Sequence, residues 1–170
     1  IPGMDLFDYV LKALPYSSHS PKRVFFLGST ETTLAMIKAK LAREFADVEM
    51  DCYSPPFKKE FSDEENKIML RKINQFNPTV LFVGMTAPKQ EKWVYVHRND
   101  IQANFICCIG AVFDFYAETI RRPHKFWIKL GLEWFIRFLK EPKRLWRRNL
   151  VSSPKFIYLV VKKKIKSLRS

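Results

Sequence analysis

The sequence lacks any hydrophobic run long enough to cross a membrane, and it lacks the pattern of an exported chain. Near the end, the longest apolar run, Phe156 to Val161, has six residues, whereas a membrane-spanning helix needs about 20. The opening residues, Ile1 to Asp5, show neither the basic start nor the apolar stretch of a signal peptide. These absences predict a cytoplasmic chain that does not span a membrane by itself.

The chain has few cysteines, and their spacing does not suggest pairs. The three cysteines are Cys52, Cys107 and Cys108, and two of them are adjacent within an apolar run. An odd number with no zinc-type spacing predicts buried thiols in a reducing compartment rather than disulfides or a metal site. We expect no metal and no cofactor.

Glycine is also scarce, and three of the five glycines end apolar runs. Gly28, Gly84 and Gly110 each follow a run typical of a strand buried on both faces, and helical patterns separate these runs. This alternation predicts an α/β, Rossmann-like, doubly wound parallel sheet with the three glycine loops along one edge, as in a nucleotide crevice. The predicted elements are a helix over 5–14, a strand over 23–28, a helix ending near 45, a strand over 47–52, a helix from the capping box at 62 to 77, a strand from 79, a helix over 88–98 and a strand over 104–109.

The stretch from Val83 to Trp93 reads as strand, tight loop and helix. Pro88 suits the first helical position, and the free N–H groups of a helix start favour phosphate or carboxylate. Gln90 and Glu91 are predicted in the first turn, facing the crevice. The alternative is an ordinary connection without a ligand.

Asp114, after the Gly110 junction, has two interpretations. Its carboxylate suits contact with ribose or sugar hydroxyls, and an aspartate at this position also suits the cap of a following helix.

Charge divides the chain into two parts. Residues 121–170 hold 16 Lys and Arg against two acids, a net charge of +14, whereas residues 1–120 hold 14 against 15. We therefore predict an α/β domain over 1–120 and a basic, aromatic, helical appendage over 121–170 whose partner is anionic. Nucleic acid, acidic lipid and a phosphorylated substrate all satisfy that charge.

Several motifs occur together in one order along the chain. They are Val83-Gly84 with Ala87-Pro88-Lys89-Gln90-Glu91-Lys92-Trp93, then Ile109-Gly110-Ala111-Val112-Phe113-Asp114-Phe115, then Arg121-Arg122-Pro123, and finally Gly131-Leu132-Glu133-Trp134-Phe135-Ile136-Arg137 with Glu141-Pro142-Lys143-Arg144. Together they resemble the WecG/TagA/CpsF family of bacterial glycosyltransferases, and the likeness covers nearly the whole chain.

The resemblance implies transfer of an N-acetylmannosamine-type sugar, or a related hexose, in the synthesis of surface polysaccharide or cell-wall polymer. The implied donor is a UDP-sugar, and the implied acceptor is a polyprenyl-diphosphate-linked sugar at the cytosolic membrane face. The family resembled is metal-independent and inverts the anomeric carbon, and its appendage is thought to dock on the membrane as a peripheral anchor. The family's proposed base, an aspartate, matches a segment upstream of Ile1, so no catalytic residue is assigned in this chain.

Residue roles follow from the same resemblance. Gln90 matches a residue beside the nucleotide sugar, and Arg137, Arg144 and Arg147 match appendage arginines proposed to bind diphosphate; solvated or lipid-facing charge is the alternative for the arginines. Thr86 and Glu118 stand where the family usually has glycine. The substrate-binding residues that we predict are Gly28, Gly84, Thr86, Gln90, Gly110 and Asp114.

The aromatic and basic residues of the appendage suit either the headgroup level of an anionic membrane or nucleic acid. A nucleotide crevice beside them favours an enzyme acting on a lipid-carried acceptor, so we do not expect nucleic acid as a partner. The alternatives are a non-enzymatic basic module that binds nucleic acid and a nucleotide-sugar-binding relative without turnover. The oligomeric state is left open, a homo-oligomer included.

Overall fold

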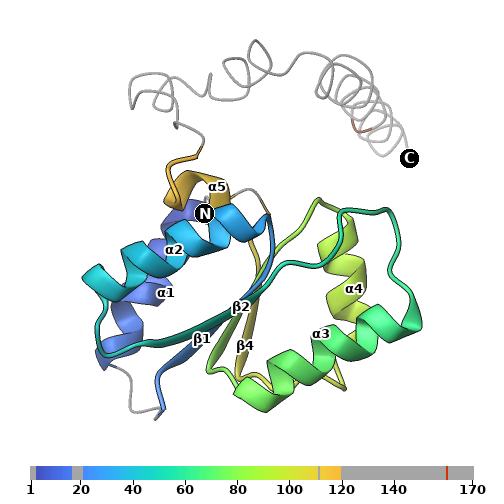
Figure 1. Ribbon diagram of the computed structural model, residues 1–170, viewed down its shortest axis with the longest axis horizontal. Coiled ribbons are helices and arrows are strands. Elements are labelled where there is room, and N and C mark those ends of the chain that lie inside the picture. The colour runs from blue at the N-terminus through green and yellow to red at the C-terminus, as the bar shows by residue number, and fades with distance from the viewer. Residues whose placement is uncertain (1–2, 17–20, 111, 120–159, 161–170) are drawn as a thin grey trace, which may run out of the picture. The chain divides into compact units, whose positions relative to one another are not determined.

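The computed structural model describes residues 3–16, 21–110, 112–119 and 160 (Figure 1). Apart from residue 160, the predicted appendage over 121–170, with the predicted diphosphate-binding residues Arg137, Arg144 and Arg147, lies outside these ranges. The division of the chain near residue 120 stays a prediction.

Four parallel strands form the sheet: β1 (Arg23–Gly28), β2 (Glu49–Tyr53), β3 (Val80–Gly84) and β4 (Phe105–Cys108). Their order is β2-β1-β3-β4. The chain therefore moves from β1 to one side and, after crossing back to β3, to the other. This is the doubly wound arrangement that the sequence predicted, and the change of direction falls between β1 and β3.

Helices cover both faces of the sheet (Figure 1). On one face lie α1, α2 and α5, and on the other lie α3 and α4. Their bounds are α1 (Gly3–Ala13), followed by a 3-10 turn (Leu14–Tyr16), α2 (Glu31–Glu44), α3 (Asp63–Phe76), α4 (Lys89–His97) and α5 (Val112–Tyr116).

Local sequence explains where the helices start and stop. The Thr30 side chain accepts a hydrogen bond from the Thr33 backbone N–H at 3.2 Å and so caps α2. Ser62 and Glu65 form the predicted capping box at the start of α3. At the other end of α3, Asn77 adopts the left-handed conformation and Pro78 follows, which stops the helix.

Alternate side chains of the central strands enter two separate cores. On β1, Val24 and Phe26 pack toward α1 and α2, whereas Phe25 and Leu27 pack toward α3 and α4. Phe7 of α1 anchors the first core, with its ring centroid 4.8 Å from that of Phe82. Because β1 and β3 are covered on both faces, their continuous apolar sequence is what this position in the sheet requires.

Some predicted details were wrong. The helix predicted from Pro88 begins at Lys89, with Pro88 as the residue before the first turn, because the backbone of Pro88 lies outside the helical region. None of the three thiols is fully buried, since Cys52 and Cys107 are half-buried and Cys108, on the edge strand β4, is exposed. Among the residues that the structure describes, no helix is long and apolar enough to cross a bilayer.

Candidate functional site

The candidate site lies at the carboxyl edge of the sheet, where β1 and β3 end side by side. Gly28 is paired with Gly84 in the register of these strands. In open α/β sheets, ligands bind outside the carboxyl ends of the strands at the point where the winding changes direction. The loops after Gly28 and Gly84 leave the sheet at this point.

Close packing explains two of the three glycines. A Cβ atom on Gly28 would lie 2.5 Å from the backbone oxygen of Gly84, and Gly28 has a φ of +118°. A Cβ atom on Gly84 would lie 2.4 Å from the ring of Phe113. The two strand ends are thus in backbone contact, and the Phe113 side chain covers one of them. Gly110 has a φ of +57°, which favours glycine at the turn into α5.

Gln90 joins two loops at this edge. Its side chain is only 3% exposed, and its Oε1 accepts a hydrogen bond from the Gly110 backbone N–H at 3.1 Å. Its Nε2 donates to Glu91 Oε1 at 2.8 Å. Gln90 lies in the first turn of α4 as predicted, but its amide is turned toward the β4–α5 loop instead of standing free in the crevice.

Asp114 is brought to the same edge. It lies within α5 rather than before its first residue, so the prediction that it caps this helix was wrong. Ser29 Oγ donates to Asp114 Oδ1 at 3.5 Å, and Ser54 Oγ donates to the Ser29 backbone oxygen at 2.7 Å. These contacts link the loops after β1 and β2 to α5. Ser29 and Ser54 were not among the predicted site residues, although each directly follows a strand.

The two positions at which the resembled family usually has glycine differ in backbone conformation. Glu118 has a φ of +60°, in the left-handed region that favours glycine. Thr86 is not among the described residues with positive φ; it is exposed, and its backbone oxygen accepts from Lys89 N–H at 2.8 Å. The backbone conformation therefore favours glycine at position 118 but not at position 86.

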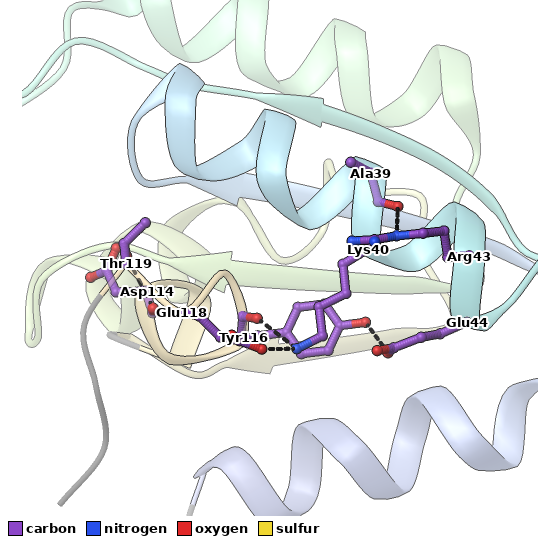
Figure 2. Close-up of polar contacts among 8 residues, drawn as sticks. All are labelled: Ala39, Lys40, Arg43, Glu44, Asp114, Tyr116, Glu118 and Thr119. Carbon is purple, nitrogen blue, oxygen red and sulfur yellow. Dashed lines mark hydrogen bonds and ion pairs between the residues drawn. The ribbon is translucent and has the colours of Figure 1, made fainter.

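A polar cluster between α2 and α5 holds Glu118 in this conformation (Figure 2). Lys40 Nζ pairs with Glu118 at 2.8 Å and donates to the Tyr116 backbone oxygen at 3.2 Å. The hydroxyl of Tyr116 donates to Glu44 at 2.8 Å, and burial together with this carboxylate raises the pKa of Tyr116. The cluster fixes the C-terminal end of α5 against α2.

Lys89, beside Gln90 in the chain, is directed away from the crevice. Its Nζ donates to the Lys58 backbone oxygen at 2.6 Å and lies 3.4 Å from the centroid of the Phe61 ring. Burial lowers the pKa of Lys89. A cation at the start of α4 therefore anchors the β2–α3 loop.

The structure thus brings five predicted substrate-binding residues to one edge: Gly28, Gly84, Gln90, Gly110 and Asp114. Thr86, the sixth, lies in the exposed loop after β3. Within the described part of the chain, no three His, Cys, Asp or Glu side chains come together as metal ligands. What this edge offers a ligand is backbone groups, the carboxylates of Asp114 and Glu91, and small hydroxyls.

The sheet order and the loops at its switch point define a Rossmann-like α/β protein. The particular family is shown by the sequence profile of the WecG/TagA/CpsF glycosyl transferases, which matches residues 1–170. The chain belongs to this family.

Individual relatives have a more specific activity in their names. Proteins of Staphylococcus aureus strains MW2 and NCTC 8325 named N-acetylglucosaminyldiphosphoundecaprenol N-acetyl-beta-D-mannosaminyltransferase are each 30% identical to this chain over 166 residues. The match covers 98% of the chain but 61% of each relative. The chain therefore spans less than two thirds of the length of these relatives.

Proposed function

We propose that the protein is an inverting, metal-independent glycosyltransferase of surface polysaccharide or cell-wall polymer synthesis. It transfers an N-acetylmannosamine-type sugar from a UDP-sugar to a sugar carried on a polyprenyl diphosphate. Family membership over the whole chain carries this proposal, and the S. aureus relatives, whose names specify N-acetylmannosamine transfer, support its choice of sugar.

The geometry of the carboxyl edge suits the donor. Asp114 offers a carboxylate that can accept hydrogen bonds from ribose or sugar hydroxyls, and Ser29, which donates to it at 3.5 Å, marks the β1 side of the same region. Gln90 supports this site by fixing the Gly110 loop through the 3.1 Å hydrogen bond. In this proposal Gln90 positions the loop that contacts the donor.

The reaction requires one bond to form as another breaks. An acceptor hydroxyl oxygen attacks the anomeric carbon of the donor sugar, the bond from that carbon to the diphosphate oxygen breaks, and UDP leaves with the electron pair. The hydroxyl proton passes to a general base, which is not assigned among the residues of this chain. We assign neutralisation of the departing diphosphate to Arg137, Arg144 and Arg147, because guanidinium binds phosphate oxygens in a bidentate manner.

The proposal is tested in two steps on the protein. Calorimetric titration should first detect UDP binding, and the D114N variant should bind UDP about tenfold more weakly, as expected for the loss of one charge-assisted hydrogen bond. The matched control is D47N, which removes an exposed aspartate between α2 and β2. Transfer is then measured from UDP-N-acetylmannosamine to an N-acetylglucosaminyl-diphospho-polyprenol, with and without EDTA. Absence of UDP binding in the wild-type protein contradicts the proposal.

The lipid that carries the proposed acceptor also implies where in the cell the enzyme works. We propose that it works as a peripheral protein on the cytoplasmic face of the membrane, held by the basic residues after 120. Removal of residues 154–170 should reduce co-sedimentation with anionic vesicles while UDP affinity stays unchanged. Equal sedimentation of the two proteins contradicts this anchoring.

A further inference from the structure

The loop from Ser54 to Phe61 connects β2 to α3, and only Ser54, its first residue, has a role in the site as described so far. It starts at the carboxyl edge, where Ser54 Oγ bonds the Ser29 backbone oxygen at 2.7 Å. In Figure 1 it leaves the upper end of β2 and passes around the outside of α4 before α3 begins. The loop is therefore next to the candidate site and at the surface.

The two flanks of the loop are fixed to the body of the protein. Lys89 Nζ donates to the Lys58 backbone oxygen at 2.6 Å and lies over the Phe61 ring at 3.4 Å. The Lys58 ammonium pairs with Glu65 of α3 at 2.6 Å. These contacts hold the second half of the loop, and the Ser54 hydrogen bond holds the first.

The tip of this fixed loop presents an aromatic side chain to solvent. Phe57 is 100% exposed, follows Pro55 and Pro56, and is followed directly by Lys58 and Lys59. Pro55 and Pro56 restrict the backbone before the tip. Phe57 is thus exposed beside Lys59, whereas the ammonium of Lys58 is paired with Glu65.

We propose that Phe57, with Lys59, is a membrane contact that places the site edge at an anionic lipid surface. An aromatic ring enters the boundary between headgroups and acyl chains, and an adjacent lysine is attracted to acidic headgroups. The inference rests on the proposed function, because a diphosphate carried on a polyprenol lies at headgroup depth, and the loop stands beside the edge that must reach it. It is a contact separate from the basic residues after 120.

A local reporter tests the contact on the full chain. The F57C variant is labelled with the fluorophore NBD at pH 7, where the native thiols react slowly because burial raises the pKa of Cys52, Cys107 and Cys108. With vesicles of 70% phosphatidylcholine and 30% phosphatidylglycerol, NBD emission should rise at least about twofold and shift to the blue, and lipids spin-labelled near the headgroup should quench it. The same label in Q75C, on the exposed surface of α3, should show neither change. Unchanged emission at position 57 overturns the proposal, whether or not the protein sediments with the vesicles.

Matched variants separate a membrane contact from other roles of the loop. Each of F57S and K59Q should weaken partitioning to these vesicles about fivefold, whereas neither Y16S nor K12Q should change it. Tyr16 is 92% exposed and follows the C-terminal end of α1, so it matches Phe57 in exposure away from the site. If F57S instead weakens UDP binding and leaves partitioning unchanged, the loop is a cover for the donor and the membrane contact is refuted. The vesicle assay contains neither donor nor acceptor, so its outcome is independent of whether transfer is observed.

Discussion

Replacement of Gln90 by glutamate tests whether this residue joins the two loops of the site. The change keeps the size of the side chain and an oxygen that can accept from the Gly110 N–H. It removes the Nε2 group that donates to Glu91 at 2.8 Å and puts a carboxylate in its place. The Q90E variant therefore replaces an attraction by a repulsion at a side chain that is 3% exposed.

The size of the effect follows from that distance. Two unit charges 2.8 Å apart repel by about 1.5 kcal/mol even in a water-like dielectric, and the lost hydrogen bond adds about 1 kcal/mol. We expect a destabilisation of about 2 to 3 kcal/mol at pH 8. For a chain of this length that lowers Tm by roughly 5 to 10 °C.

The loss of stability should depend on pH with a defined sign. The repulsion raises the pKa of the introduced carboxyl in the folded protein above its unfolded value of about 4.3. The folded variant then binds a proton more tightly than the unfolded chain, so its stability relative to the wild type increases as pH falls through the raised pKa. The penalty is complete above that pKa and is relieved below it, when the protonated carboxyl can donate to Glu91.

Thermal unfolding of wild type, Q90E and Q90L between pH 4.5 and 8 measures these differences. Q90L leaves the Gly110 N–H without its acceptor at every pH, so its penalty should not change with pH. Q75E adds the same charge at an exposed position of α3 and should behave as the wild type. If Q90E is as stable as the wild type at pH 8 and only its UDP affinity changes, Gln90 faces the ligand and does not bridge the loops.

The G84A variant should lose about 2 kcal/mol of stability, because its Cβ would lie 2.4 Å from the Phe113 ring, and F113L should restore part of that loss in urea unfolding of the double variant. At position 118, where φ is +60°, E118G should melt roughly 3 °C above E118A, since both lose the same ion pair and only glycine relieves the left-handed backbone. A lower Tm for E118G than for E118A contradicts this. In the C107S variant, alkylation of Cys108 at pH 8 should be about 100-fold slower than for an ordinary thiol, because partial burial raises the pKa of this thiol to about 11. The alkylation rate should rise as the pH is raised toward about 11. A rate that levels off near pH 9 contradicts this prediction.

The fold was predictable because its signals are local in the sequence. The apolar run before Gly28 identifies a strand covered on both faces, and Thr30 and Ser62 mark helix starts within three residues of their partners. Alternation of such strands and helices leaves few arrangements other than a parallel sheet. The family motifs added the expectation of function to this frame.

The internal contacts of the site were not predictable because they join distant residues. Gly84 must be glycine because of the Phe113 ring, and Gln90 is buried because of the Gly110 N–H, partners 29 and 20 residues away along the chain. The sequence pattern placed Gln90 in the first turn of a helix but carried no information about the direction of its amide. For the same reason the sequence left Asp114 between a ligand contact and a helix cap, since its neighbour Ser29 lies 85 residues away.

The backbone contact between Gly28 and Gly84 has a consequence for how this protein can diversify. A Cβ on Gly28 would meet the Gly84 backbone and a Cβ on Gly84 would meet the Phe113 ring, so neither position can vary without a shift of its neighbour, and neither can serve to distinguish one sugar from another. Ser29, just beyond Gly28, is itself held at a φ of +60°, whereas Thr86, in the loop after Gly84, is exposed and has no such restriction. Changes in substrate preference should therefore accumulate in the loop after β3, over an edge that stays constant.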